Sequence, residues 1–225
     1  MKLHFKSAGS GDPVIILHGL FGMLDNWATF ARYLSETFQV FTVDLRNHGR
    51  SPHAESFNYD VLAEDIREFI LEHNLAPATL MGHSLGGKTA MLTALRWPDL
   101  VDKLIVVDMA PKAYVPQHDQ VIAALEQTDP ASAGSRTEIE EALVAQLEDI
   151  GVARFLMKNV ARDTSGKLHW RMNLPILIAH YAETTRALPA DLQYPGPALF
   201  VRGGNSRYIL DADMELIRKL FPVAF

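Results

Sequence analysis

Five short runs of apolar residues, each closed by turn-forming residues, divide the chain. They cover residues 13–19, 38–44, 77–82, 103–108 and 197–204. Their apolar positions are continuous rather than alternating, which is typical of strands covered on both faces of a sheet. Between these runs, apolar residues recur at helical spacing: Val61, Leu62, Ile66, Phe69 and Ile70, and again Leu85, Met91, Leu92 and Leu95. This alternation of strand and helix predicts an α/β fold with a mostly parallel, doubly wound sheet.

The stretch from residue 112 to residue 188 departs from this alternation, and its pattern predicts consecutive helices. In one of them, Thr137 and Glu140 have the spacing of a capping box. We therefore expect residues 1–111 and 189–225 to form an α/β core, with residues 112–188 inserted as a helical cap.

The composition is typical of one globular domain. Of the 225 residues, 48% are hydrophobic and 21% are charged, and the formal net charge is −6. This charge gives no general attraction to nucleic acid or to an anionic membrane, so we expect a small molecule as the partner. No apolar run approaches the roughly 20 residues of a membrane span and no signal peptide is recognisable, which predicts a cytoplasmic protein. The chain has no cysteine, and we expect neither a cofactor nor a metal site.

Residues 81–91, MGHSLGGKTAM, match two catalytic motifs at once. Gly82, Ser84 and Gly86 have the spacing of the strand-to-helix turn that exposes a nucleophilic serine. The same stretch has Gly82, Gly87, Lys88 and Thr89 at the spacing of a P-loop that holds phosphate. The apolar strand that ends at Asp108 also resembles the strand that carries a magnesium-binding aspartate in nucleotide enzymes. However, a P-loop usually follows the first strand of its domain, and here other strands precede it.

A second turn favours the serine chemistry. Residues 16–22, ILHGLFG, end a predicted strand in glycine-containing backbone that could direct N–H groups toward a cleft. An oxyanion hole takes one donor from such a loop and the other from the residue after the nucleophile, which is Leu85. The loop donor is then Leu20, with Phe21 as the alternative.

With these motifs the chain resembles the α/β-hydrolases, and closely the small bacterial YbfF-type esterases. The similarity rests on HGLFGMLDNW (18–27), DLRNHGRSPH (44–53), GHSLGGKTAM (82–91), VVDMAP (106–111) and FVRGGNS (200–206). It implies a serine hydrolase that cleaves carboxylic esters or thioesters, in which Ser84 is the nucleophile and Asp108 the acid of the triad. In that family the Gly-Gly-Lys stretch lies in the helix after the serine and binds no phosphate.

Other residues have supporting roles in this interpretation. Asp44 and Arg46 are expected to pair and stabilise a turn that also holds His48. Side chains expected to line an acyl pocket are those of Phe21, Met109, Phe155 and Trp170.

The catalytic base is the part that the resemblance does not supply. In the family the histidine follows a final strand beyond a helix that corresponds to residues 211–221, so we expect that strand, its histidine and the last helix to be absent from this chain. The 225-residue chain is then expected to be nearly inactive as an esterase. His118, His169 and His180 are the alternatives for the base, all within the predicted cap. Residues 197–204 would form an unpaired sheet edge, which predicts self-association. A P-loop enzyme and a ligand-binding hydrolase scaffold without catalysis remain the alternative functions.

Overall fold

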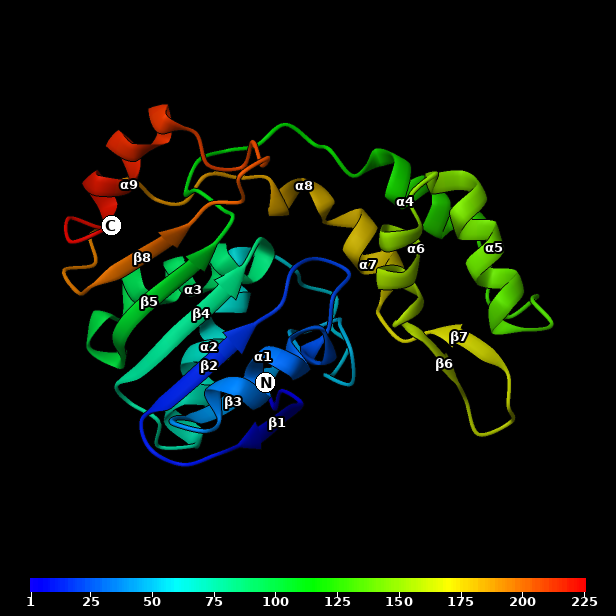
Figure 1. Cartoon of the computed structure of the whole chain (residues 1–225), viewed down its shortest axis with the longest axis horizontal. Helices are drawn as coiled ribbons and strands as arrows, with labels where there is room; N and C mark the ends of the chain where they lie inside the picture. Colours follow the sequence, from blue (N-terminus) through cyan, green and yellow to red (C-terminus); the bar gives the residue numbers. More distant parts are fainter.

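A computed structural model describes residues 1–225 and contains a six-stranded sheet in the order β1-β3-β2-β4-β5-β8 (Figure 1). Its strands are β1 (Phe5–Ala8), β2 (Pro13–Leu17), β3 (Gln39–Val43), β4 (Ala78–His83), β5 (Val101–Val107) and β8 (Ala198–Val201). β1 is antiparallel to β3, and every other neighbouring pair is parallel. The prediction of a mostly parallel sheet is therefore confirmed. β1 was not predicted, because its sequence FKSA is short and half polar.

Helices cover both faces of the sheet. They are η1 (Leu24–Trp27), α1 (Ala28–Leu34), α2 (Tyr59–Glu72), α3 (Leu85–Arg96), η2 (Pro98–Leu100), η3 (Asp211–Asp213) and α9 (Met214–Leu220). Successive strand residues point to opposite faces. Ile15 and Leu17 of β2 therefore join the main core with α2 and α3, whereas Val14 and Ile16 pack with Trp27 and α1.

Residues 112–188, which we call the inserted segment, lie between β5 and β8 in the chain. Figure 1 shows this segment beyond the carboxyl ends of the strands, which the arrowheads mark. Its elements are α4 (Asp119–Gln127), α5 (Arg136–Leu147), α6 (Ile150–Met157), β6 (Val160–Arg162), β7 (Leu168–Trp170), α7 (Leu174–Ala179) and α8 (Tyr181–Thr184). The expectation of helices alone is wrong, because β6 and β7 form an antiparallel hairpin. None of the helices of the chain is long and apolar enough to cross a bilayer.

The start of α5 also differs from the prediction. Ser135 is its N-cap, and the Ser135 hydroxyl accepts the Glu138 N–H at 3.2 Å while the Glu138 carboxylate accepts the Gly134 N–H at 2.9 Å. Thr137 and Glu140, the predicted capping box, lie inside the helix. The same Ser/Thr-x-x-Glu spacing occurs twice here, and only the first occurrence precedes the helix.

β8 is the edge strand of the sheet, and the residues after α9 run along part of it. The Phe225 N–H donates to the Ala198 carbonyl at 3.1 Å, and the Phe200 N–H donates to the Phe225 carbonyl at 3.0 Å. The expectation of a wholly unpaired edge is therefore wrong for this half of β8. Leu199 and Val201 keep 36% and 42% of their surface exposed.

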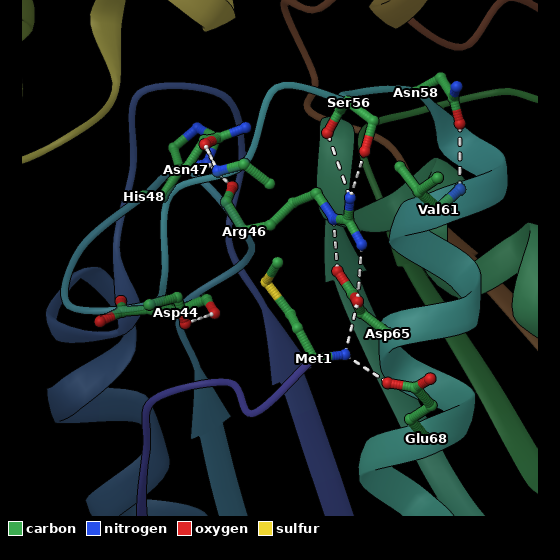
Figure 2. A network of polar contacts seen from close by, with 12 residues as sticks. Met1, Asp44, Arg46, Asn47, His48, Ser56, Asn58, Val61, Asp65 and Glu68 are labelled. Carbon is green, nitrogen blue, oxygen red and sulfur yellow. Dashed lines mark hydrogen bonds and ion pairs between the residues drawn. The ribbon is translucent and has the colours of Figure 1, made fainter.

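A buried ion pair anchors the loop between β3 and α2 (Figure 2). The Arg46 guanidinium donates to both carboxylate oxygens of Asp65 on α2, at 2.6 and 2.8 Å, and also to the Ser56 hydroxyl and carbonyl. Asp44 accepts two backbone N–H groups instead, so the predicted pairing of Asp44 with Arg46 is wrong. The bidentate contact fixes the position of the loop that carries His48.

Candidate active site

Ser84 lies at a sharp turn between β4 and α3, with φ 52° and ψ −116°. A positive φ is unfavourable for a residue with a side chain, and it persists here because the surrounding backbone is tightly packed. A Cβ on Gly82 would lie 2.1 Å from the Gly86 carbonyl oxygen, and a Cβ on Gly86 would lie 2.5 Å from the Leu17 carbonyl oxygen. The turn can therefore close only with glycine at both positions, and Ser84 lines two cavities.

The sheet register brings Ser84 and Asp108 together. His83 of β4 pairs with Val107 of β5, and the Ser84 N–H donates to the Val107 carbonyl at 3.3 Å. Asp108 directly follows the end of β5, and its carboxylate accepts the Gly203 N–H at 3.1 Å. Both side chains line the larger cavity.

Two residues that line a cavity with Ser84 have backbone N–H groups without an acceptor in the chain. The Leu20 N–H, in the loop after β2, makes no hydrogen bond within the chain. Leu85 is the first residue of α3, where an N–H has no acceptor within the helix. Phe21, the alternative donor, has its N–H engaged with His48 Nε2 at 3.2 Å. Leu20 and Leu85 both line the smaller cavity together with Ser84.

Three buried side chains hold the loop that carries Leu20. His18 Nδ1 bonds the Gly19 carbonyl at 2.8 Å, His48 Nε2 accepts the Phe21 N–H, and Asn159 Nδ2 donates to the Phe21 carbonyl at 2.7 Å. Asn159 belongs to the inserted segment and is fully buried. A lone asparagine carries no motif, so this contact could not be predicted from the sequence.

Both of these histidines are held in the neutral state. His18 Nε2 accepts the Leu45 N–H at 3.0 Å, and His48 Nδ1 bonds the Arg46 carbonyl at 2.9 Å, so each ring has one accepting and one donating nitrogen. Burial lowers the pKa of His18 to about 4 and the pKa of His48 to about 3. Since all four ring nitrogens are engaged, neither histidine is placed to take a proton from Ser84.

The two cavities have volumes of about 510 Å³ and 30 Å³ and share four lining residues: Leu20, Ser84, His118 and Tyr208. Of the side chains predicted for a pocket, Phe21 and Phe155 line the larger cavity and Met109 lines the smaller one. Trp170, also expected there, lines neither cavity. Its indole N–H donates to the Thr128 carbonyl at 3.2 Å, which places this side chain in the packing of the inserted segment.

A family model described as alpha/beta hydrolase fold matches residues 12–142. The chain belongs to the α/β-hydrolase fold family. It is 36% identical to esterase YbfF of Escherichia coli (strain K12), over 100% of this chain and 88% of the relative. It is 35% identical to the sn-1-specific diacylglycerol lipase ABHD11 of Xenopus tropicalis, over 98% of this chain and 71% of that protein. A solved structure of a marine microorganism esterase superposes with a TM-score of 0.96 at 42% identity, covering 99% of this chain and 88% of that one.

In this α/β-hydrolase the Gly-Lys-Thr stretch does not form a phosphate site, so the P-loop interpretation is wrong. The Lys88 side chain is fully buried in α3, and its ammonium donates to the Arg186 carbonyl. It lies 5.4 Å and 4.8 Å from the ring centroids of Tyr59 and Tyr114. The Thr89 hydroxyl donates to the Leu85 carbonyl inside the same helix. Nowhere in the hydrolase do three or more His, Asp or Glu side chains gather as a potential metal site.

The remaining histidines differ in their access to Ser84. His83 and His118 line the larger cavity, and His118 also lines the smaller one. Burial lowers the pKa of His83, and the nearby Asp108 carboxylate opposes this shift. His169 and His180 line neither cavity. No histidine of the chain forms a hydrogen bond with the Ser84 hydroxyl.

Proposed function

We propose that this protein is a serine hydrolase that cleaves carboxylic esters or thioesters through an acyl-enzyme on Ser84. The observation that carries the proposal is the turn at Ser84, which lines one cavity together with Leu20 and Leu85, two residues whose backbone N–H groups have no acceptor within the chain. Membership of the α/β-hydrolase family and similarity to proteins named as esterases support the same chemistry.

The chemistry follows from where charge develops. Ser84 Oγ attacks the ester carbonyl, and the carbonyl oxygen becomes an oxyanion that accepts hydrogen bonds from the N–H groups of Leu20 and Leu85. One such donor is typically worth about 10²- to 10³-fold in kcat. Asp108 lines the larger cavity together with Ser84, and one of its carboxylate oxygens accepts a single N–H; its role is to orient an imidazole that takes the serine proton. Since no histidine of the chain bonds the Ser84 hydroxyl, we expect turnover by these 225 residues to be low. The alcohol or thiol leaves, and water then hydrolyses the acyl-enzyme.

The cavity walls favour substrates with an apolar acyl group of modest length. Phe21, Trp27, Val152, Phe155 and Leu156 line the larger cavity, and the last three come from α6 of the inserted segment. That segment therefore acts as a cap over the site. The proposed partner is a small-molecule ester, and neither nucleic acid nor a membrane is proposed as a partner. A cytoplasmic location stays a prediction from the sequence.

Labelling with a fluorophosphonate tests the nucleophile independently of the substrate. We expect one covalent adduct, located on Ser84 by peptide mass spectrometry and absent from Ser84→Ala. A panel of p-nitrophenyl esters and thioesters of increasing acyl length then tests the reaction class. Ligand binding without labelling would indicate a non-catalytic scaffold, and labelling of another residue would refute the assignment of Ser84.

A further inference from the structure

The hydroxyl of Tyr181 fixes the proton of a histidine in the active site. It accepts the backbone N–H of Gln117 at 3.0 Å and that of His118 at 3.1 Å. A hydroxyl has two acceptor lone pairs and one hydrogen, so its remaining hydrogen is free to donate. The third partner is His118 Nδ1, at 2.8 Å. Tyr181 must therefore donate to this nitrogen.

This contact determines the state of the His118 ring. Because Nδ1 accepts a hydrogen bond, the single proton of the neutral imidazole lies on Nε2. Protonation of Nδ1 would set two hydrogens against each other along the contact with Tyr181. Burial also lowers the pKa of His118, with Asp119 opposing the shift. His118 is thus a neutral ring that presents an N–H from Nε2.

The Nε2 atom is the free nitrogen of a ring that lines both cavities beside Ser84. It forms no hydrogen bond within the chain, and the only buried side-chain nitrogen or oxygen atoms without a partner are Asn47 Nδ2 and Asn159 Oδ1. Nε2 is therefore not fully buried, and solvent or a ligand can reach it. Since His118 and Ser84 line the same two cavities, an ester bound at Ser84 lies within the space that His118 borders.

We propose that His118 is a specificity-determining residue, whose Nε2–H binds an acceptor oxygen of the substrate other than the scissile carbonyl. This inference rests on the proposed function, in which the scissile carbonyl is bound by Leu20 and Leu85. It favours esters that carry an additional ether, carbonyl or hydroxyl oxygen over purely alkyl esters. It also excludes His118 as the base, because Tyr181 occupies Nδ1 and the other ring nitrogen, Nε2, already holds a proton.

The ring state can be tested without any turnover. Long-range ¹H–¹⁵N spectra of protein with ¹⁵N-labelled histidine distinguish the two neutral tautomers and the imidazolium, and comparison with His118→Phe assigns the signals. We expect the Nε2–H tautomer near neutral pH, and a loss of this preference in Tyr181→Phe. A His118 signal of the Nδ1–H tautomer or of the imidazolium would overturn the inference.

Binding to Ser84→Ala, which holds esters without cleaving them, tests the specificity. The probes are p-nitrophenyl esters of methoxy acids of increasing length, each matched with the alkanoate of the same number of chain atoms, as methoxyacetate is with butyrate. At least one methoxy ester should bind about two- to tenfold tighter than its match and shift the His118 Nε2 signal.

Variants at His118 complete the test. His118→Phe should abolish the preference, whereas His118→Gln, which keeps an N–H donor, should retain part of it. His169→Phe is the matched control on an exposed histidine. Equal affinities within every pair, or a preference that survives in His118→Phe, would refute the role of His118. Failure of the proposed function would appear separately, as the absence of phosphonate labelling at Ser84.

Discussion

The side-chain amide of Asn159 donates a hydrogen bond to the carbonyl of Phe21 at 2.7 Å, across 138 positions of the chain. Phe21 has a φ of 59° and follows Leu20, whose N–H is the proposed oxyanion donor. The inserted segment thus holds the loop on which that donor depends. A displacement of the segment would move the proposed oxyanion donor, the Leu20 N–H, as well as the cavity walls.

We expect Asn159→Ala to lower kcat about tenfold or more with a smaller effect on KM, since a loosened Leu20 N–H weakens binding of the transition state. The buried Phe21 carbonyl would also lose its partner, at a cost of about 1–3 kcal/mol in unfolding free energy. Asn173→Ala is the control, because Asn173 bonds Asn47 and does not touch the loop. Ester kinetics and urea unfolding measure both effects, and equal kcat values for the two variants would contradict this role.

Gly86→Ala should distort the turn at Ser84. Its Cβ would lie 2.5 Å and 2.6 Å from the carbonyl oxygens of Leu17 and His18, and these are backbone atoms that cannot rotate away. We expect a loss of about 2 kcal/mol or more in stability and a strong decrease in the rate of phosphonate labelling. Gly204→Ala, whose Cβ would meet nothing within 4 Å, should leave both properties unchanged.

Lys88 should make stability depend on pH in the alkaline range. Burial lowers the pKa of Lys88 to about 7 from its ordinary 10.5, so between these values the unfolded chain binds a proton that the folded chain does not. The unfolding free energy should therefore rise with pH from about 7 to about 10, by on the order of a few kcal/mol. Lys88→Met should remove this slope, and Lys167→Met, on the surface, should retain it. Denaturant unfolding at a series of pH values provides the comparison.

His48 should contribute to acid sensitivity. Its pKa is lowered to about 3 by burial and by the nearby His18, whereas the unfolded histidine titrates near 6.5. As the pH falls below about 6.5 the unfolded chain takes up the proton first, so stability is lost progressively toward pH 3. In His48→Gln an amide oxygen can accept the Phe21 N–H without titrating, and we expect a shallower loss between pH 7 and pH 5. His169→Gln should behave as the parent protein does.

The edge of the sheet should mediate self-association. β8 exposes Leu199 and Val201, and only part of its backbone is paired by Phe225. We expect sedimentation velocity to show association that increases with protein concentration. Val201→Lys should suppress it, because a charged residue on an edge strand opposes pairing with another chain. Leu71→Lys, which changes a comparably exposed residue on α2, should not.

Much of the fold follows from local patterns in the sequence. The continuous apolar runs became β2, β3, β4, β5 and β8, because a parallel strand buried on both faces can tolerate few polar residues. The proximity of Ser84 and Asp108 follows as well. Each residue ends one of two neighbouring parallel strands, and the carboxyl ends of such strands lie at the same edge of the sheet.

Contacts that depend on tertiary structure were not predictable in this way. His18 and His48 lie in recognisable motifs. Their role in holding the loop at Phe21 was not predictable, because it depends on the loops after β2 and β3 lying side by side. Lys88 matched a phosphate-binding motif, and the packing of Tyr59 and Tyr114 around its ammonium could not be predicted from that match. The β6–β7 hairpin is a further case, because strands of three residues carry too little pattern to separate from helix.

The inserted segment enters and leaves the core at adjacent points. The Leu188 N–H donates to the Pro111 carbonyl at 2.9 Å, and the Tyr114 N–H donates to the Thr185 carbonyl at 2.8 Å, so the two connections are bonded to each other. A segment whose ends already meet adds little loop-closure cost when its length changes. Evolution or design could therefore exchange this segment as a module and alter substrate preference while the sheet and its nucleophile stay in place. A graft would need to preserve one contact above all, the hydrogen bond from Asn159 to the Phe21 carbonyl, which holds the loop of the proposed oxyanion donor.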